Sequence, residues 1–111
     1  MVRDFGYLLD VLHEARTALE FTKGKIYADF EQDTKLQYAI IRAVEIMGEA
    51  ASRVSTDFRE SHPELPWREM IGMRNKMIHD YEEISLPVVW EVVERDIPEL
   101  IHLIEPLIPP E

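Results

Sequence analysis

The apolar residues between Asp33 and Val54 recur at alternating intervals of four and three, a spacing that an α-helix gathers onto one face. Six positions form this seam: Leu36, Ile40, Ala43, Met47, Ala50 and Val54. Such a narrow seam is typical of helices that pack side by side, and Asp33 is a residue type that often begins a helix. Gly48 and Ala51 would let a neighbouring helix approach closely. The chain is therefore expected to fold as a helical bundle.

A first helix is predicted over Val2–Phe21, where apolar side chains return every three or four residues. Gly24 is expected to end it, since glycine readily adopts the backbone conformation that follows a helix. The stretch Lys23–Asp33 then connects to the next helix, with one helical turn around Ile26–Phe30.

A third helix is predicted over Pro66–His79, because proline is well tolerated in the first turn, where its missing N–H has no partner to lose. The preceding stretch, Ser55–Pro66, contains two prolines and is expected to be a loop with one helical turn at Asp57–Glu60.

Ser85 is expected to cap a fourth helix that has Pro87 in its first turn and continues to Leu107 or Ile108. Pro98 lies inside this helix and should kink it, because its ring clashes with the carbonyl of Glu94. The predicted fold class is all-α, a four- to five-helix up-and-down bundle whose last helix is kinked at Pro98.

Length and composition predict a single domain over residues 1–111. The chain is 46% hydrophobic and has no cysteine, which favours a globular protein of the reducing cytoplasm. No signal peptide or apolar run of the ~20 residues that cross a bilayer is visible, so no membrane partner is expected. Disulfides and thiolate metal sites are excluded, and no glycine-rich phosphate loop is present.

A formal net charge of −10 is unfavourable for a general nucleic-acid binder, which would normally present a basic face. It does not exclude a nuclease with a small local cationic site. The acidic surface is explained most simply by solubility, and a basic partner is the alternative.

The stretch from Arg74 to Tyr81 concentrates the reactive residue types of the chain. Arginine is always charged and can bind two phosphate oxygens at once, whereas histidine exchanges protons near neutral pH. Arg74 and His79 are therefore the types of side chain that could cleave RNA without a metal ion. The alternative is that both side chains only interact with the carbonyls at a helix end.

Helix geometry constrains this pair, because positions five apart point about 140° away from each other. Asn75 and His79 are neighbours on one face, so Asn75 could orient the imidazole, while Arg74 must reach around. The helix could instead end near His79, or a second subunit could complete the site. We favour a homodimer in which two copies of the motif pool their cationic groups in one cleft.

The motif Arg74-x4-His79-x-Tyr81 resembles the signature of HepT toxins in the HEPN superfamily. Three further blocks resemble the same family in order: 41–51, 63–75, and Val89-Trp90 with 96–98. The resemblance covers nearly the whole chain.

The resemblance implies a dimeric HEPN bundle and a metal-independent endoribonuclease toxin with Arg74 and His79 catalytic and Asn75 accessory. It also implies a minimal nucleotidyltransferase antitoxin as partner, which adds AMP to the motif tyrosine, here Tyr81. A phosphodiester and a base on Tyr81 would add negative charge and bulk where RNA phosphates must bind.

Lys76 and Arg68 either extend the cationic cleft or are ordinary surface charges. Glu45 and Glu49 could form an acid–base pair, but a solvated face or ion pairs with Arg42 or Arg53 are more common for such spacing. The remaining histidines are expected to be surface or packing residues: His13, His62 and His102. No metal or cofactor site is predicted.

The competing hypothesis is a non-catalytic module. In that case the helical dimer would bind the nucleotidyltransferase or a nucleotide, with Arg74 and His79 contacting phosphate only. The intact motif favours the enzyme.

Overall fold

A computed structural model describes residues 2–72 and 84–109 of the chain, and the regular elements in these ranges are all helices. They are α1 (Val2–Thr22), α2 (Tyr27–Gln32), α3 (Thr34–Arg53), α4 (Thr56–Ser61), a helical stretch over 67–72, α6 (Leu86–Glu91), the π-helical turn η2 (Val92–Asp96), α7 (Ile97–Ile104) and the 3-10 turn η3 (Glu105–Leu107). The expected all-α class is confirmed.

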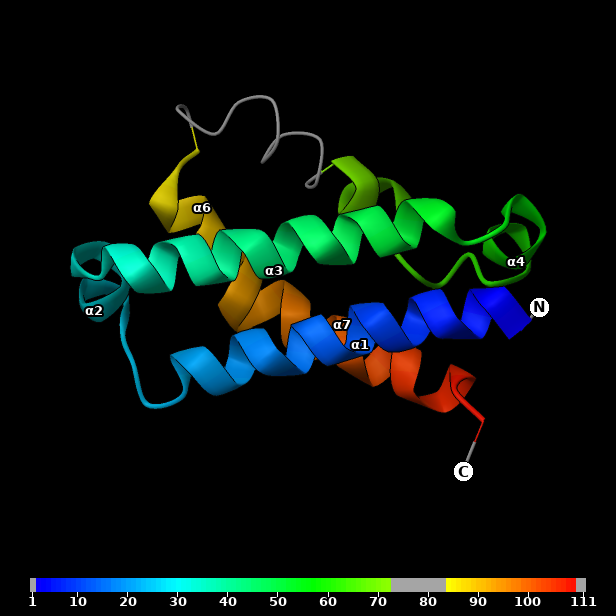
Figure 1. Ribbon diagram of the computed structural model, residues 1–111, viewed down its shortest axis with the longest axis horizontal. Helices are drawn as coiled ribbons and strands as arrows, with labels where there is room; N and C mark the ends of the chain where they lie inside the picture. The colour runs from blue at the N-terminus through cyan, green and yellow to red at the C-terminus, as the bar shows by residue number, and fades with distance from the viewer. Residues whose placement is uncertain (1, 73–83, 110–111) are drawn as a thin grey trace.

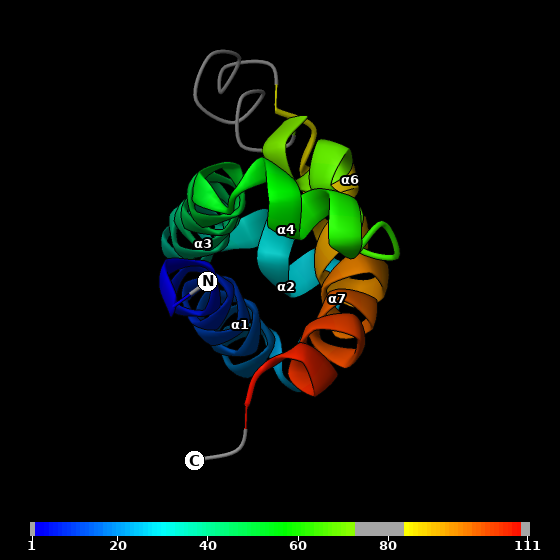
Figure 2. The ribbon, with the colours of Figure 1, turned by 90° about the vertical axis from the view of Figure 1, so that its right-hand side faces the viewer.

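The two long helices, α1 and α3, run antiparallel and form the most extensive helix pair among residues 2–72 and 84–109 (Figure 1). The continuous stretch α6–η2–α7 crosses behind them as a second layer, and α7 packs against α1 (Figure 2). The short helices α2 and α4 lie at opposite ends of the α1–α3 pair (Figure 1). This arrangement is the bundle that the apolar spacing predicts.

The apolar seam of α3 faces the core over its whole length. All six predicted seam residues, from Leu36 to Val54, are buried, and Ile40 has no exposed surface at all. The side chain of Asp33 caps the helix by accepting a hydrogen bond from the backbone N–H of Leu36 at 3.0 Å. The helix thus begins directly after Asp33, as expected, and ends one residue before Val54, the last seam residue.

Gly24 has a φ of +75°, the left-handed conformation that glycine adopts without steric penalty at the end of a helix. It follows α1 as expected, and α1 extends one residue beyond the predicted end, to Thr22. The single helical turn expected around Ile26–Phe30 is α2, whose residue Phe30 is fully buried.

The last helix is interrupted by the π-helical turn η2, where the N–H of Ile97 donates to the carbonyl of Val92. Pro98, the second residue of α7, has no N–H and so cannot continue the regular pattern of helical hydrogen bonds. The wider π-helical turn lies just before this proline, within one helical stretch. The kink at Pro98 stays a prediction. Ser85 begins α6 as expected, but its side chain makes no capping hydrogen bond.

Trp67 and Trp90 belong to the core, as their phase with the apolar residues predicts. Within residues 2–72 and 84–109, the helices are too short or too polar to cross a membrane.

Candidate functional site

The predicted site residues Arg74, Asn75, Lys76, His79 and Tyr81 lie outside the described residues, so the convergence of Arg74 and His79 stays a prediction. The structure does describe the elements on either side of them. These are the helical stretch 67–72 on the N-terminal side and α6 on the C-terminal side.

The helical stretch 67–72 is fixed to the bundle by its first turn. Pro66 accepts a hydrogen bond from the N–H of Met70 at 3.0 Å, which places the proline where its own missing N–H costs nothing. The indole N–H of Trp67 donates to the carbonyl of His62 at 2.9 Å, and the ring packs edge-on against Phe58. The side chains of Trp67 and Met70 are both buried. The chain thus enters the motif from a firmly packed helix.

A buried carboxylate ties the start of α1 to the start of α4. Asp4 accepts hydrogen bonds from the backbone N–H and the hydroxyl of Ser55, both at 2.8 Å, and Ser55 in turn caps α4 by accepting from the N–H of Phe58. The backbone N–H of Ser55, followed by its hydroxyl, lowers the pKa of Asp4, although burial acts in the opposite direction. Asp4 is therefore held ionised and fixes the helix against which Trp67 packs.

The C-terminal flank, α6, is fixed by aromatic packing. Trp90 lies with its ring centre 5.2 Å from that of Phe30 and 6.4 Å from that of Tyr27, so α6 packs on α2. Both flanks of the motif are thus held by large buried side chains, which is the rigid support that a positioned active site needs.

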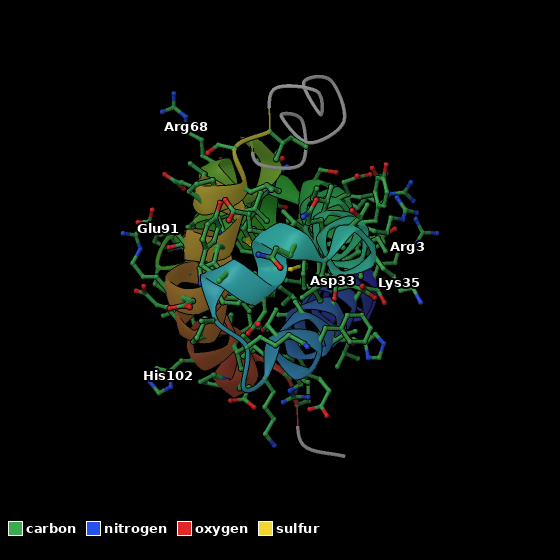
Figure 3. All side chains as sticks on the ribbon, turned by 90° about the vertical axis from the view of Figure 1, so that its left-hand side faces the viewer. Arg3, Asp33, Lys35, Arg68, Glu91 and His102 are labelled. Atoms are coloured by element: carbon green, nitrogen blue, oxygen red, sulfur yellow. The ribbon has the colours of Figure 1, made fainter. Side chains whose placement is uncertain are left out.

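Arg68 is the predicted site residue that the structure describes, and it is exposed on the 67–72 stretch. Figure 3 shows it extending from the bundle into solvent, well apart from Arg3. Together with Arg59 of α4 it lines an open groove of about 600 Å³ between α4 and residues 67–72. Arg59 is half-buried, and its Nε donates to the carbonyl of Val54 at 3.2 Å. Arg59 was not among the predicted site residues, because an arginine between Asp57 and Glu60 in the sequence is typical of ordinary surface charge.

A second hollow of about 360 Å³ lies between α3, the 64–70 segment and the η2–α7 stretch. Its floor is apolar and includes Met47, Met70 and Leu100, while its lining includes several acidic side chains and one arginine. Arg95 of this lining is ion-paired with Glu91 and Asp96. The surplus of carboxylates makes this hollow unsuitable for phosphate groups.

The paired carboxylates of α3 are structural partners of arginines. Glu45 lies 3.4 Å from Arg42, and Glu49 lies 3.0 Å from Arg53, as the more common alternative predicts. The acid–base hypothesis for these residues therefore gains no support.

The three isolated histidines also match the simpler expectation. His13 and His102 are exposed, and His62 packs its ring on Phe58 at 4.4 Å between ring centres. Among the described residues, the histidine and acidic side chains form no group that could hold a metal ion.

Comparison with known proteins identifies the family to which this helical chain belongs. A family model described as "Ribonuclease HepT-like" matches residues 11–107, a span that includes both flanks and the whole Arg74–Tyr81 stretch. The chain belongs to the HepT-like ribonuclease family. No solved structure gives a significant match to this HepT-like chain.

Several curated relatives of the HepT-like chain are similar over most of their length. A protein of Thermococcus cleftensis called "Probable ribonuclease HepT" is 46% identical over 85% of this chain and 86% of its own. A protein of Methanocaldococcus jannaschii called "Putative RNase" is 42% identical over 86% and 87%. A protein of Caldanaerobacter subterraneus subsp. tengcongensis, also called "Putative RNase", is 40% identical over 85% and 84%. Membership of this family supports an RNase function.

Proposed function

We propose that this HepT-like chain is a metal-independent endoribonuclease toxin of the cytoplasm, with Arg74 and His79 as its catalytic residues. The observation that carries the proposal is the intact Arg74–x4–His79–x–Tyr81 motif inside the span that matches the ribonuclease family. The rigid packing of both flanks supports it, since acid–base catalysis depends on fixed geometry.

The two residues have complementary roles in the proposed reaction. Arg74 binds the non-bridging oxygens of the scissile phosphate and stabilises the negative charge that builds up during attack. His79 takes the proton from the ribose 2′-hydroxyl, whose oxygen then attacks the phosphorus and displaces the 5′-oxygen of the next nucleotide. The leaving oxygen must gain a proton in turn, and a second imidazole is the natural donor.

A homodimer supplies that second imidazole in the proposed site. Two copies of the motif in one cleft would bring together two guanidinium groups and two imidazoles, with Asn75 orienting His79 and Lys76 adding charge. Pooling also concentrates positive charge on a chain whose formal net charge is −10.

The purified chain is expected to cleave single-stranded RNA in the presence of excess EDTA at the rate seen without the chelator. The reason is that a guanidinium and an imidazole together supply the charge and the proton transfer that a metal ion would otherwise supply. Gel analysis of labelled RNA measures the rate. Loss of cleavage in EDTA and its return with Mg²⁺ would overturn metal independence while leaving the RNase assignment in place.

We further propose that a minimal nucleotidyltransferase acts as the antitoxin and transfers AMP from ATP to the hydroxyl of Tyr81, with release of pyrophosphate. The added phosphodiester carries a negative charge and would repel RNA phosphates from the cleft.

Co-incubation with such a nucleotidyltransferase and ATP is expected to add the mass of AMP to the wild-type chain and to stop RNA cleavage. Replacing Tyr81 with phenylalanine removes the acceptor oxygen, so this variant should stay unmodified and keep cleaving. Mass spectrometry and the RNA assay measure both effects. Inhibition of Tyr81→Phe to the same extent as wild type would refute a role for this hydroxyl.

A further inference from the structure

We propose that the groove between α4 and residues 67–72 binds the phosphates of the RNA strand next to the cleavage site, through Arg59 and Arg68. The inference rests on the proposed ribonuclease function and assigns part of its substrate path. It goes beyond the motif because Arg59 comes from a separate helix, α4.

Ion pairing among the described arginines singles out this groove. Four of the seven described arginines lie within 4.0 Å of a carboxylate: Arg16, Arg42, Arg53 and Arg95. An anionic ligand would have to compete with these carboxylates for the four guanidinium groups. Arg59, Arg68 and Arg3 show no ion pair in the part of the chain that the structure describes, and two of these three line one groove.

The geometry of Arg59 leaves its charge available. Its Nε is used by the carbonyl of Val54, which fixes the side chain while the two terminal nitrogens stay free of any carboxylate partner among the described residues. Because the guanidinium is already held in place, it loses little further conformational freedom when it binds an anion, and its planar fork fits a phosphate.

The lining of the groove suits a nucleic-acid backbone. Thr56 offers a hydroxyl, and Trp67 and Ile71 provide an apolar floor against which a ribose can lie. Glu60 is the single carboxylate among the lining residues, so the two arginines leave a local excess of positive charge. The acidic hollow between α3 and α7 has the opposite balance.

The position of the groove relates it to the motif. Gly72 is one of its lining residues and precedes Arg74 by two positions in the sequence. An RNA strand lying along the groove would therefore meet the polypeptide immediately before the catalytic motif. The proposal needs no particular arrangement of the motif residues.

The test measures binding of a short single-stranded RNA whose riboses are 2′-O-methylated, because this probe keeps every phosphate but has no 2′-hydroxyl to attack. Fluorescence anisotropy at several salt concentrations gives both affinity and its salt dependence. In the full chain, the double variant Arg59→Gln/Arg68→Gln is expected to bind about tenfold more weakly or worse. The slope of log K against log salt should fall in magnitude by about 1.4, because each single-strand phosphate contact contributes about 0.7.

The matched control is the double variant Arg16→Gln/Arg42→Gln, which removes the same charge from two exposed, ion-paired arginines of α1 and α3. It should bind the probe almost as wild type does and keep the wild-type slope, and thermal unfolding should show both variants folded. A second variant, Arg59→Lys/Arg68→Lys, should retain the slope because its charge is unchanged.

Equal losses in the groove variant and the control would overturn the proposal, since only total charge would then matter. Binding of the probe by the groove variant with wild-type affinity would overturn the proposal as well. If the groove variant binds the probe more weakly and the wild-type chain cleaves no unmodified RNA, the groove proposal is supported and the ribonuclease proposal is refuted. If the wild-type chain cleaves unmodified RNA and the groove variant binds the probe as wild type does, the ribonuclease proposal is supported and the groove proposal is refuted.

Discussion

Replacing His79 with alanine is expected to lower the rate of RNA cleavage by about 10²–10⁴-fold, because the proposed proton transfer then has no imidazole to carry it out. Arg74→Ala should cost a similar factor by removing charge stabilisation from the transition state. Arg74→Lys should recover only part of this loss, since an ammonium cannot bind two phosphate oxygens in a planar fork. Initial rates on labelled RNA, measured in EDTA, give all three values.

Matched histidine variants separate catalysis from a general effect of losing an imidazole. His13 lies on α1 and His102 on α7, and both are exposed, so His13→Ala and His102→Ala should cleave RNA at the wild-type rate. Wild-type cleavage by both His79→Ala and Arg74→Ala would remove the catalytic assignment. The motif would then fit the competing module that binds a nucleotidyltransferase or a nucleotide and uses these side chains only to contact phosphate.

The sequence predicted the helices best where a strong periodic signal and a local capping signal coincide. The seam from Leu36 to Val54 and the cap at Asp33 located α3, since burial and backbone hydrogen bonding require the same register there. Gly24 similarly marked the end of α1. The family blocks at 41–51 and 63–75 then led to the family that the comparisons confirm.

Other features left no clear local signal in the sequence. For the π-helical turn at 92–96, the sequence indicated only the nearby proline, Pro98. The ion pairs of the arginines depend on which carboxylates the fold brings close. Arg16, for example, pairs with Glu105 from the far end of the chain, whereas Arg59 has acidic neighbours in sequence and no ion pair among the described residues. The catalytic geometry of Arg74 and His79 stays a prediction.

Phe30→Ala is expected to lower the free energy of unfolding by about 3–5 kcal/mol, as is usual when a buried phenylalanine is truncated. The ring has no exposed surface and packs between Tyr27 and Trp90. Its loss would leave a cavity that the rigid aromatic neighbours cannot fill by relaxing. Because small domains have a total stability of about 5–15 kcal/mol, this one change should remove a large part of it. Urea unfolding followed by circular dichroism measures the change.

Phe21→Ala is the control for this prediction, because Phe21 is 45% exposed at the end of α1 and its truncation should cost far less. The comparison also bears on the proposed site. Phe30 holds α6, one of the two flanks that support the motif, through its contact with Trp90, so Phe30→Ala is expected to lower the rate constant of RNA cleavage as well. A fall in the rate constant at a temperature where the variant is fully folded would show that the α2–α6 contact positions the motif. A stability equal to that of Phe21→Ala would contradict the aromatic core described for this end of the bundle.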